Sequence, residues 1–296
     1  MPFLELHLRL RASEQPLVEA AIEAQGSLAI TLLDAEDVPI LEPGVGETPL
    51  WPELTLTALF PAELDKLDLL VALDENIPAH ILHTAKFAHV DDKDWTRVWM
   101  DTYQPMQFGK RLWIVPTTHT PPDPDAVNIR LDPGLAFGTG THPTTAMCLA
   151  WLDGLDLQGK TVLDFGCGSG ILAIAALKLG AAHAYGVDND PQALIASQEN
   201  AYRNGVHARF TVLSDKDDAP PACDVLVANI LLPPLLTLKK LLASGCKPGA
   251  LAAFSGMLAG QDAELIPAYQ GYFEDLETMQ QGDWIRVAGR RCLVKV

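Results

Sequence analysis

The sequence predicts a two-domain α/β protein, in which a doubly wound sheet follows a smaller α+β domain. Three observations carry this prediction. The chain has 296 residues, too many for one small domain, and 48% of them are hydrophobic. Strand and helix patterns alternate from Lys160 onward. At 162–172 a buried strand runs into a glycine-rich turn and then into the start of a helix.

The glycine-rich turn points to a ligand that comes close to the backbone. Glycine tolerates positive φ, and the free N–H groups of a helix start suit a negatively polarised group. The dinucleotide fingerprint Gly-x-Gly-x-x-Gly would need glycine at position 171 or 173, where this chain has Ile171 and Ala173. The spacing therefore disfavours a nicotinamide-dependent oxidoreductase. The turn instead reads Asp-x-Gly-x-Gly-x-Gly, with Asp164, Gly166, Gly168 and Gly170.

The first 90 residues predict the element order β-α-β-β-α-β, which is that of a small ferredoxin-like domain. Strands are expected where apolar and polar residues alternate, and helices where apolar residues recur at helical spacing. The expected strands are 3–10, 28–33, 54–60 and 87–90. The first expected helix begins near Ser13. The second covers 61–74 and has Leu64, Leu67, Leu70 and Val71 on one face.

Residues 91–104 predict a short linker helix between the two domains. Acidic residues open it, where the helix dipole favours them. Trp95, Val98 and Trp99 are spaced to share one face, and we interpret them as docking the linker on a domain rather than as a binding site. The chain is thus expected to divide into domains at 1–90 and 105–296, joined by 91–104.

The second domain predicts seven strands in its main sheet, because five strands alternate with helices and two more close the chain as a hairpin. The expected strands are 161–165, 182–187, 207–212, 224–229, 250–254, 273–279 and 284–296. The expected helices are 146–155, 170–179, 191–204, 234–243 and 261–270. Two further strands are expected ahead of this sheet, at 111–116 and 126–131.

Polar residues stand where three predicted strands end, and ligands of open α/β sheets bind beyond such carboxyl ends. Besides the glycine turn, Asp188 closes a strand 24 residues beyond Asp164 and can accept the hydroxyls of a ribose. Asn229 ends another strand before a proline-started helix, and its amide oxygen can accept hydrogen bonds from an amine. A helix cap is the alternative for Asn229, and Asp190 before Pro191 is expected to be a helix cap. The conjunction favours a nucleoside-type ligand.

A stretch dense in glycine and threonine, 137–145, leads into a helix that Pro143 helps to start. Hydroxyls and free N–H groups gathered there can hold a polar ligand, although a solvated capping loop is the alternative. The role of His142 stays open at this stage. Its ordinary pKa of about 6.5 suits a base, and a cap or a packing role is equally compatible with its position.

The charge of the chain is unevenly distributed. The formal net charge is −17, and residues 1–104 hold 19 Asp and Glu but only 6 Lys and Arg, against 19 and 15 in residues 105–296. An acidic front domain repels nucleic acid and attracts a basic partner. The alternative is that the acidic residues serve only solubility.

The sequence favours a reducing, intracellular location. Five cysteines are widely spaced without a Cys-x-x-Cys pair, so neither a disulfide framework nor a metal site is indicated. The alternating first residues lack the form of a signal peptide, and no apolar run reaches the roughly 18 residues of a membrane span. We therefore expect a cytoplasmic protein.

The glycine turn, Asp188 and the segment 225–234 resemble class I methyltransferases that use S-adenosylmethionine. More specifically, 131–145, 162–170 and 225–234 resemble the bacterial ribosomal protein L11 methyltransferases, and the similarity extends to Trp95 and Trp284. From Asn229 this chain reads Asn-Ile-Leu-Leu-Pro-Pro. The related release-factor glutamine methyltransferases carry Asn-Pro-Pro-Tyr at the equivalent place. The missing Pro-Pro-Tyr argues against that relative.

The resemblance implies a fold, a reaction and a set of site residues. The fold is the seven-stranded class I methyltransferase sheet, with 1–90 as the substrate-recognition domain and 105–296 as the domain that holds S-adenosylmethionine. The reaction is N-methylation, to the trimethyl stage, of lysine side chains and the N-terminal amine of ribosomal protein L11. The expected cofactor contacts are Thr145, Gly166, Asp188 and Asn229, together with Phe137, Thr141, Asp164, Gly168 and Gly170.

Catalysis is expected to need orientation more than proton chemistry, because the sulfonium methyl is already activated. Asn229 and the backbone carbonyl of Ile230 are the groups expected to orient the amine. The expected partner is free L11 before ribosome assembly, with no nucleic acid and no membrane involved, and the protein is expected to be a monomer. The alternatives are a methyltransferase for another protein or for a small-molecule amine, and a non-catalytic protein that only binds the cofactor.

Overall fold

The computed structural model describes residues 2–36, 40, 49–90, 103–132, 140–214, 216–217 and 219–293. The chain forms two compact units, one within 1–98 and the other within 99–296. Most of the predicted linker helix, 91–102, lies outside the described residues, and Tyr103 and Gln104 after it are not helical.

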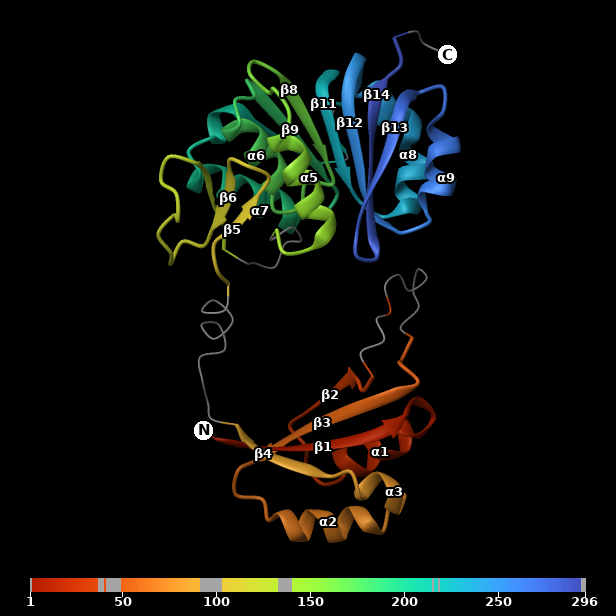
Figure 1. The fold of residues 1–296 in the computed structure, drawn as a ribbon. Coiled ribbons are helices and arrows are strands. Elements are labelled where there is room, and N and C mark those ends of the chain that lie inside the picture. The colour runs from red at the N-terminus through yellow and green to blue at the C-terminus, as the bar shows by residue number, and fades with distance from the viewer. Residues whose placement is uncertain are drawn as a thin grey trace. The chain divides into compact units, whose positions relative to one another are not determined.

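The first unit is a four-stranded sheet with helices on one face (Figure 1). Its strand order is β2-β3-β1-β4, and every neighbouring pair is antiparallel. Alternate residues of β1 are buried against the helices, so one face of the sheet makes the core. The strands are β1 (Phe3–Arg11), β2 (Ala29–Asp34), β3 (Glu53–Pro61) and β4 (Lys86–Val90). The helices are η1 (Ala12–Glu14), α1 (Gln15–Glu23), α2 (Lys66–Asp74) and α3 (Ala79–Leu82).

The predicted apolar face of the second helix is wrong at Leu67 and Val71. Helix α2 begins only at Lys66, after Asp65, whose side chain accepts hydrogen bonds from two backbone N–H groups of the first turn. Leu69 and Leu73 are the residues that enter the core. Leu67 and Val71, which the spacing placed on the buried face, are exposed. Apolar residues crowd 67–73 on nearly all sides, so periodicity alone does not identify the buried stripe.

The second unit contains the predicted doubly wound sheet of seven strands (Figure 1). Its strand order is β10-β9-β8-β11-β12-β14-β13, and β14 runs in the direction opposite to the other six strands. The strands are β8 (Thr161–Phe165), β9 (His183–Asp188), β10 (Phe210–Ser214), β11 (Cys223–Asn229), β12 (Cys246–Leu258), β13 (Phe273–Gln281) and β14 (Trp284–Arg291). The α/β fold class is therefore confirmed.

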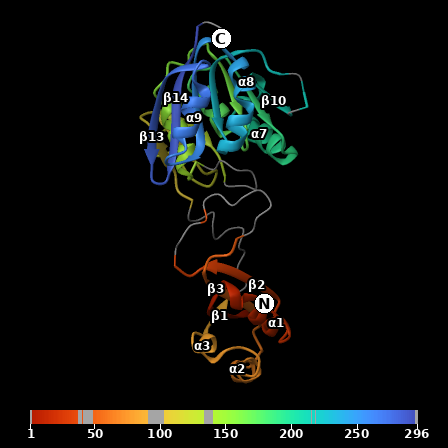
Figure 2. The same cartoon turned by 90° about the vertical axis from the view of Figure 1, so that its right-hand side faces the viewer.

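Helices cover both faces of this sheet, which is what doubly wound means. Successive residues of β8 show it, because Val162 packs into one core cluster and Leu163 into the other. The first cluster includes residues of α5 (Pro143–Asp153), α6 (Ile171–Lys178) and α7 (Pro191–Arg203). The second includes residues of α8 (Leu232–Ser244) and α9 (Asp262–Tyr269), which lie next to each other in Figure 2.

A separate three-stranded sheet packs on the first cluster. It consists of β5 (Met106–Phe108), β6 (Leu112–Val115) and β7 (Val127–Arg130), with β6 in the middle. The strands β6 and β7 were predicted from sequence, whereas the three residues of β5 were not. Phe108, Leu112 and Ile129 join the core with α5 and α6, so this sheet closes one side of the unit. Across the described part of the chain, no helix is long and apolar enough to cross a membrane.

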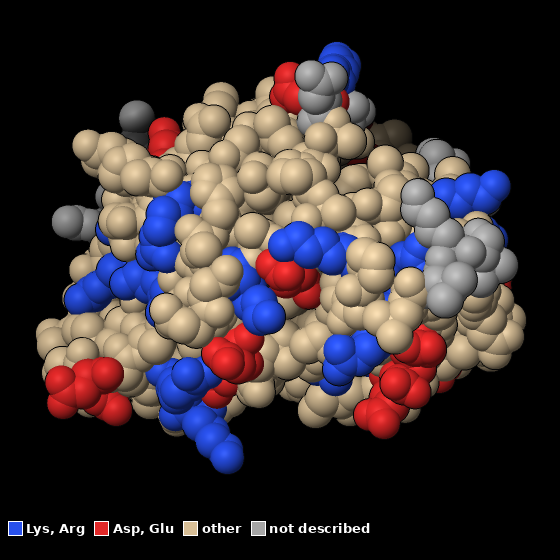
Figure 3. Space-filling view, turned by 90° about the horizontal axis from the view of Figure 1, so that it is seen from above, with Lys and Arg blue, Asp and Glu red and all other residues tan. Residues whose placement is uncertain are grey.

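The N-terminal ends of the parallel strands form one edge of the main sheet, at the top of the unit in Figure 1. Seen from above, Lys and Arg are interspersed there with Asp and Glu (Figure 3). Asp224 accepts hydrogen bonds from the Thr161 backbone and hydroxyl and from Lys247. Partial burial opposes the charge of Asp224, but these donors outweigh it and lower its pKa to about 2. These hydrogen bonds thus link β8, β11 and β12 at this edge.

Candidate functional site

The three strand ends that carry the predicted site residues are neighbours in the main sheet. Strand β8 lies between β9 and β11, and Asp164 pairs with Gly186 on one side and Val227 on the other. All three strands are parallel, so Asp188, the glycine turn and Asn229 emerge at the same edge. The structure therefore brings together residues that are up to 65 positions apart (from Asp164 to Asn229).

The glycine turn needs glycine for its backbone shape. Gly166, Gly168 and Gly170 all have positive φ, at 76°, 52° and 76°. Gly170 is the N-cap of α6 and has no side chain to close that helix end. The Gly166 N–H donates to the Val187 carbonyl at 2.8 Å, which holds the turn against β9. The result is a backbone loop at a helix N-terminus, the arrangement that suits a polar ligand.

The turn also requires close approach of its neighbours. A Cβ on Gly166 would lie 2.3 Å from the Cγ2 atom of Ile230, and one on Gly170 would lie 2.9 Å from the Cβ atom of Ser197. Asn200, on the same helix as Ser197, donates from its side chain to the Ser169 carbonyl at 2.9 Å. Sequence reasoning missed Asn200, because a single polar residue in an amphipathic helix carries no distinguishing signal.

Asp188 links the turn to β9. Its Oδ2 atom accepts the Gly168 N–H at 2.8 Å, and its Oδ1 atom accepts the Asp190 N–H at 3.0 Å. Asp190 itself caps α7 by accepting the Gln192 N–H, as predicted. Each carboxylate oxygen of Asp188 has a second lone pair, so the residue retains capacity for two ligand hydroxyls.

Asp164 is fully buried and incompletely hydrogen-bonded. Its Oδ2 atom accepts the Ala173 N–H at 3.0 Å, whereas Oδ1 has no hydrogen-bond partner among the described residues. Burial raises the pKa of this carboxyl to about 7, the Ala173 N–H opposes the rise, and the neighbouring charge of Asp188 adds to it. A buried carboxylate with an unsatisfied oxygen is poised for a cationic or hydrogen-bonding partner.

Asn229 is held by a residue that lies 84 positions earlier. Its Nδ2 atom donates to the Thr145 hydroxyl at 3.2 Å, and its Oδ1 atom is covered but has no partner within the described ranges. Thr145 lies on α5 and is fully buried, so in this structure it supports Asn229. The N-cap of α8 is Leu231, which rules out the capping role for Asn229. The amide oxygen is therefore left to accept from a ligand.

His142 is the N-cap of α5, which settles the question that the sequence left open. Its Nδ1 atom faces the Thr144 N–H at 3.4 Å and the Thr144 hydroxyl at 2.7 Å. The centroid of its ring lies 4.5 Å from that of the Trp284 ring, in an edge-to-face arrangement. Burial lowers the pKa of His142. Thr141 precedes this cap and is exposed. Phe137 lies outside the described residues.

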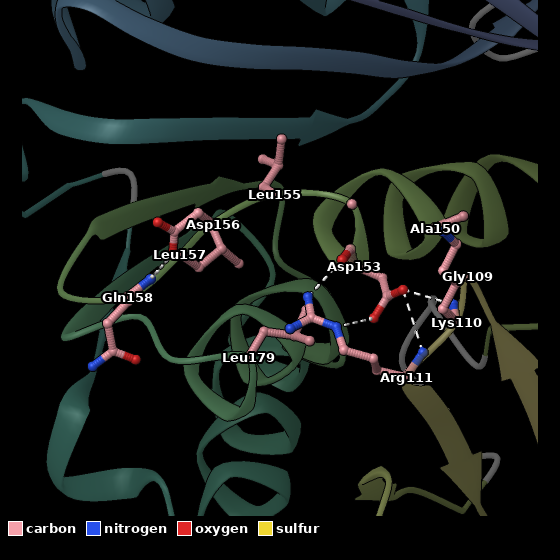
Figure 4. Close-up of a pocket in the computed structure, with 11 residues that line it drawn as sticks. Gly109, Lys110, Arg111, Ala150, Asp153, Leu155, Asp156, Leu157, Gln158 and Leu179 are labelled. Carbon is pink, nitrogen blue, oxygen red and sulfur yellow. Dashed lines mark hydrogen bonds and ion pairs between the residues drawn. The ribbon is translucent and has the colours of Figure 1, made fainter.

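A hollow of about 610 Å³ lies elsewhere in this unit, between the end of α5, the turn before β6 and the segment 155–158 (Figure 4). That segment leads into the start of β8, so the hollow is at the opposite edge from the glycine turn. Its buried carboxylate, Asp153, already accepts the Lys110 N–H at 2.6 Å and pairs with the Arg111 guanidinium at 3.2 Å. The described residues that line it include none of the predicted site residues, and we assign it no part in the reaction.

Comparisons with known proteins identify the family of this chain. Residues 2–292 match the family model of the ribosomal protein L11 methyltransferases (PrmA). Ribosomal protein L11 methyltransferases of Stenotrophomonas maltophilia (strain R551-3) and Pseudomonas aeruginosa (strain LESB58) are 54% and 52% identical, each alignment covering 98% of this chain and 99% of the relative. A crystal structure of the ribosomal protein L11 methylase from Lactobacillus delbrueckii subsp. bulgaricus is 35% identical with a TM-score of 0.58, covering 64% of this chain and 100% of that chain. The chain belongs to the ribosomal protein L11 methyltransferase family.

Proposed function

We propose that this protein transfers methyl groups from S-adenosylmethionine to amines of ribosomal protein L11. The targets are lysine side chains and the N-terminal amine, each carried to the trimethyl stage. The observation that carries the proposal is Asn229, whose buried Oδ1 atom is without a partner in the described structure and lies at the edge that the glycine turn also forms. The protein acts as a monomer in the cytoplasm, on free L11 and without binding nucleic acid.

The residues at this edge fit the cofactor. The two hydroxyls of a ribose match the remaining lone pairs of Asp188. The positive φ angles of the glycine turn and the close contacts around it leave backbone N–H groups at the start of α6 to face polar ligand atoms. The unsatisfied Oδ1 atom of Asp164 suits the positive charge that S-adenosylmethionine carries. Thr141, Phe137, Gly168 and Gly170 stay predicted contacts.

The cofactor supplies an activated methyl group on a sulfonium centre, so the chain mainly has to align the amine. A neutral amine has N–H groups to donate and a lone pair for attack. In the first transfer the Asn229 Oδ1 atom accepts one N–H and the Ile230 carbonyl accepts the other. A monomethylated amine keeps one N–H and a dimethylated amine none, so these two acceptors orient the first two transfers. The ordinary lysine pKa of about 10.4 leaves most amines protonated at neutral pH, so desolvation at the site helps to release the proton to water.

The first unit is proposed to dock the substrate. Residues 1–104 hold 19 acidic and 6 basic residues, and ribosomal proteins are usually basic. Attraction between opposite charges speeds the encounter of two proteins, and this attraction weakens as salt screens it. The functional division at 1–90, 91–104 and 105–296 is part of this proposal.

Salt is expected to raise the KM for L11 about tenfold between 0.1 M and 1 M, since the screening length falls from about 10 Å to about 3 Å. The KM for S-adenosylmethionine, a small ligand bound in the second unit, is the internal control and should change little. Steady-state rates at each salt concentration give both values. A KM for L11 that does not depend on salt would leave the acidic residues with only a solubility role.

Cofactor affinity is expected to rise with pH up to about 7. Burial raises the pKa of Asp164 in the folded protein to about 7, so proton binding by this carboxyl stabilises the fold. The stabilisation is complete below the ordinary pKa of 3.8 and is lost as pH rises through about 7. Binding a cationic ligand favours the ionised form. The affinity for S-adenosylmethionine, measured by calorimetry, should therefore fall by up to about tenfold per pH unit below 7. Asp164→Asn should flatten this profile, and an equally steep profile in that variant would contradict the role given to Asp164.

The experiment that tests the substrate compares initial rates of methyl transfer to L11, to another basic ribosomal protein and to free lysine. We expect transfer to L11 to dominate. Transfer to the other protein or to free lysine at a similar rate would replace L11 with a broader protein or small-amine substrate, while leaving the methyltransferase reaction in place.

A further inference from the structure

Strand β12 contains a bulge beside Asn229 and Ile230, at the end of β11. Its pairing with β14 shifts register between Ser255 and Met257, so Gly256 is the extra residue. Gly256 is buried and has a φ of +88°. On its other side β12 pairs in parallel with β11, where Ser255 lies opposite Asn229. The bulge thus sits beside the end of β11, where the site begins.

The bulge receives the peptide of Ile230. The Ile230 N–H donates to the Ser255 carbonyl at 3.0 Å. A Cβ on Gly256 would lie 2.5 Å from the Ile230 carbonyl oxygen, 2.7 Å from its carbon and 3.0 Å from its nitrogen. All three are backbone atoms, so no side-chain rotation can relieve the contact. Gly256 therefore allows a closeness to Ile230 that no other residue permits.

The side chain of Ile230 packs against the glycine turn. A Cβ on Gly166 would lie only 2.3 Å from its Cγ2 atom. The β12 bulge thus contacts the peptide of Ile230, and the turn assigned to the cofactor contacts its side chain. The hydroxyl of Ser255, which is fully buried, donates to the Ile285 carbonyl at 2.9 Å and fixes the bulge to β14.

We infer that Gly256 is a positioning residue for methyl transfer, acting through the Ile230 peptide. This inference rests on the proposed function, in which the Ile230 carbonyl and the neighbouring Asn229 amide orient the amine. The bulge fixes the distance of that carbonyl from the glycine turn, and so the distance between the amine and the methyl group. Nothing in Gly256 itself contacts the substrate.

The test is Gly256→Ala, with Gly260→Ala as the matched control. Gly260 has nearly the same backbone angle, φ +91°, but a Cβ there meets nothing within 4 Å. Both variants carry the cost of alanine at positive φ, and only the first pushes on Ile230. A displacement of roughly 1 Å costs about 100-fold in rate when reacting groups are misaligned. We expect that loss in Gly256→Ala alone.

The readout is the single-turnover rate of methyl transfer to L11 for each cofactor-loaded site, with loading measured by titration of S-adenosylhomocysteine. A loss of folded protein changes the number of sites and leaves the rate at each site unchanged, so this readout separates positioning from stability. Equal rates in the two variants would overturn the inference. An inactive wild-type protein would instead overturn the proposed function.

A second variant applies if Gly256→Ala does not fold. Ile230→Ala removes the side chain that the glycine turn holds and adds no atoms. We expect it to slow single-turnover transfer by about tenfold with cofactor affinity within about threefold of wild type, because the carbonyl loses one of its two supports. An unchanged rate in Ile230→Ala would contradict the positioning role.

Discussion

Asn229→Ala is expected to slow methyl transfer to L11 by a factor of about 10² to 10³, the range typical of losing one preorganised group that meets the reacting centre. The amide oxygen is the atom proposed to accept from the amine, and the Thr145 hydroxyl holds the amide in place. Cofactor affinity should change by less than about tenfold, since at most one hydrogen bond to it is lost. Single-turnover rates and calorimetric titration give the two quantities separately.

Asn128→Ala is the matched control for this change. Asn128 also donates from Nδ2, to the Asp123 and Ala126 carbonyls, and its Oδ1 atom is likewise buried with no partner in the described structure. It lies on β7 in the three-stranded sheet, not on the strands that carry the site. Its variant should transfer methyl groups at the wild-type rate. Full activity in Asn229→Ala would remove Asn229 from the mechanism.

Asp188→Ala is expected to weaken cofactor binding by about 100-fold or more, since two hydrogen bonds from the ribose to a charged group, about 1.5 kcal/mol or more each, are lost. The Gly168 N–H also loses its acceptor, which loosens the glycine turn. The rate at saturating cofactor should stay within several-fold of wild type, because Asp188 orients neither the amine nor the methyl group. This pattern is the opposite of that expected for Asn229→Ala.

Asp123→Ala controls for the loss of a local turn. The Asp123 Oδ1 atom accepts the N–H of Asp125 at 3.0 Å, which reproduces the contact between Asp188 and Asp190. Affinity for S-adenosylhomocysteine should be unchanged in this control. A wild-type affinity in Asp188→Ala itself would show that the ribose is held elsewhere.

The main sheet was predictable because its central strands are short apolar runs with clear ends. Strand β8 was expected at 161–165 and is found there, between the turn at Lys160 and the glycine turn. Strand β12 was expected at 250–254, but it extends from Cys246 to Leu258. Its extension to Leu258 depends on pairing with β14, and its first residue, Cys246, pairs with Cys223 of β11. Residue patterns do not display such non-local contacts.

The sequence indicates candidate residues for the site but not the contacts among them. The motif positions of Asp188 and Asn229 follow from strand ends, whereas the bond between Asn229 and Thr145 joins residues that only the fold brings together. Gly256 was missed as well, although an isolated glycine inside a strand is a recognised sign of a bulge. What that bulge touches, the Ile230 peptide, is visible only in three dimensions.

The most direct test of the proposed reaction is the intact mass of purified L11 after incubation with this protein and S-adenosylmethionine, beside a parallel incubation with Asn229→Ala. The account predicts a ladder of methyl-sized mass increments with the wild-type protein and almost none, in the same time, with the variant. An unchanged mass of L11 with the wild-type protein, under conditions where calorimetry shows bound cofactor, would contradict the assignment of L11 as the substrate.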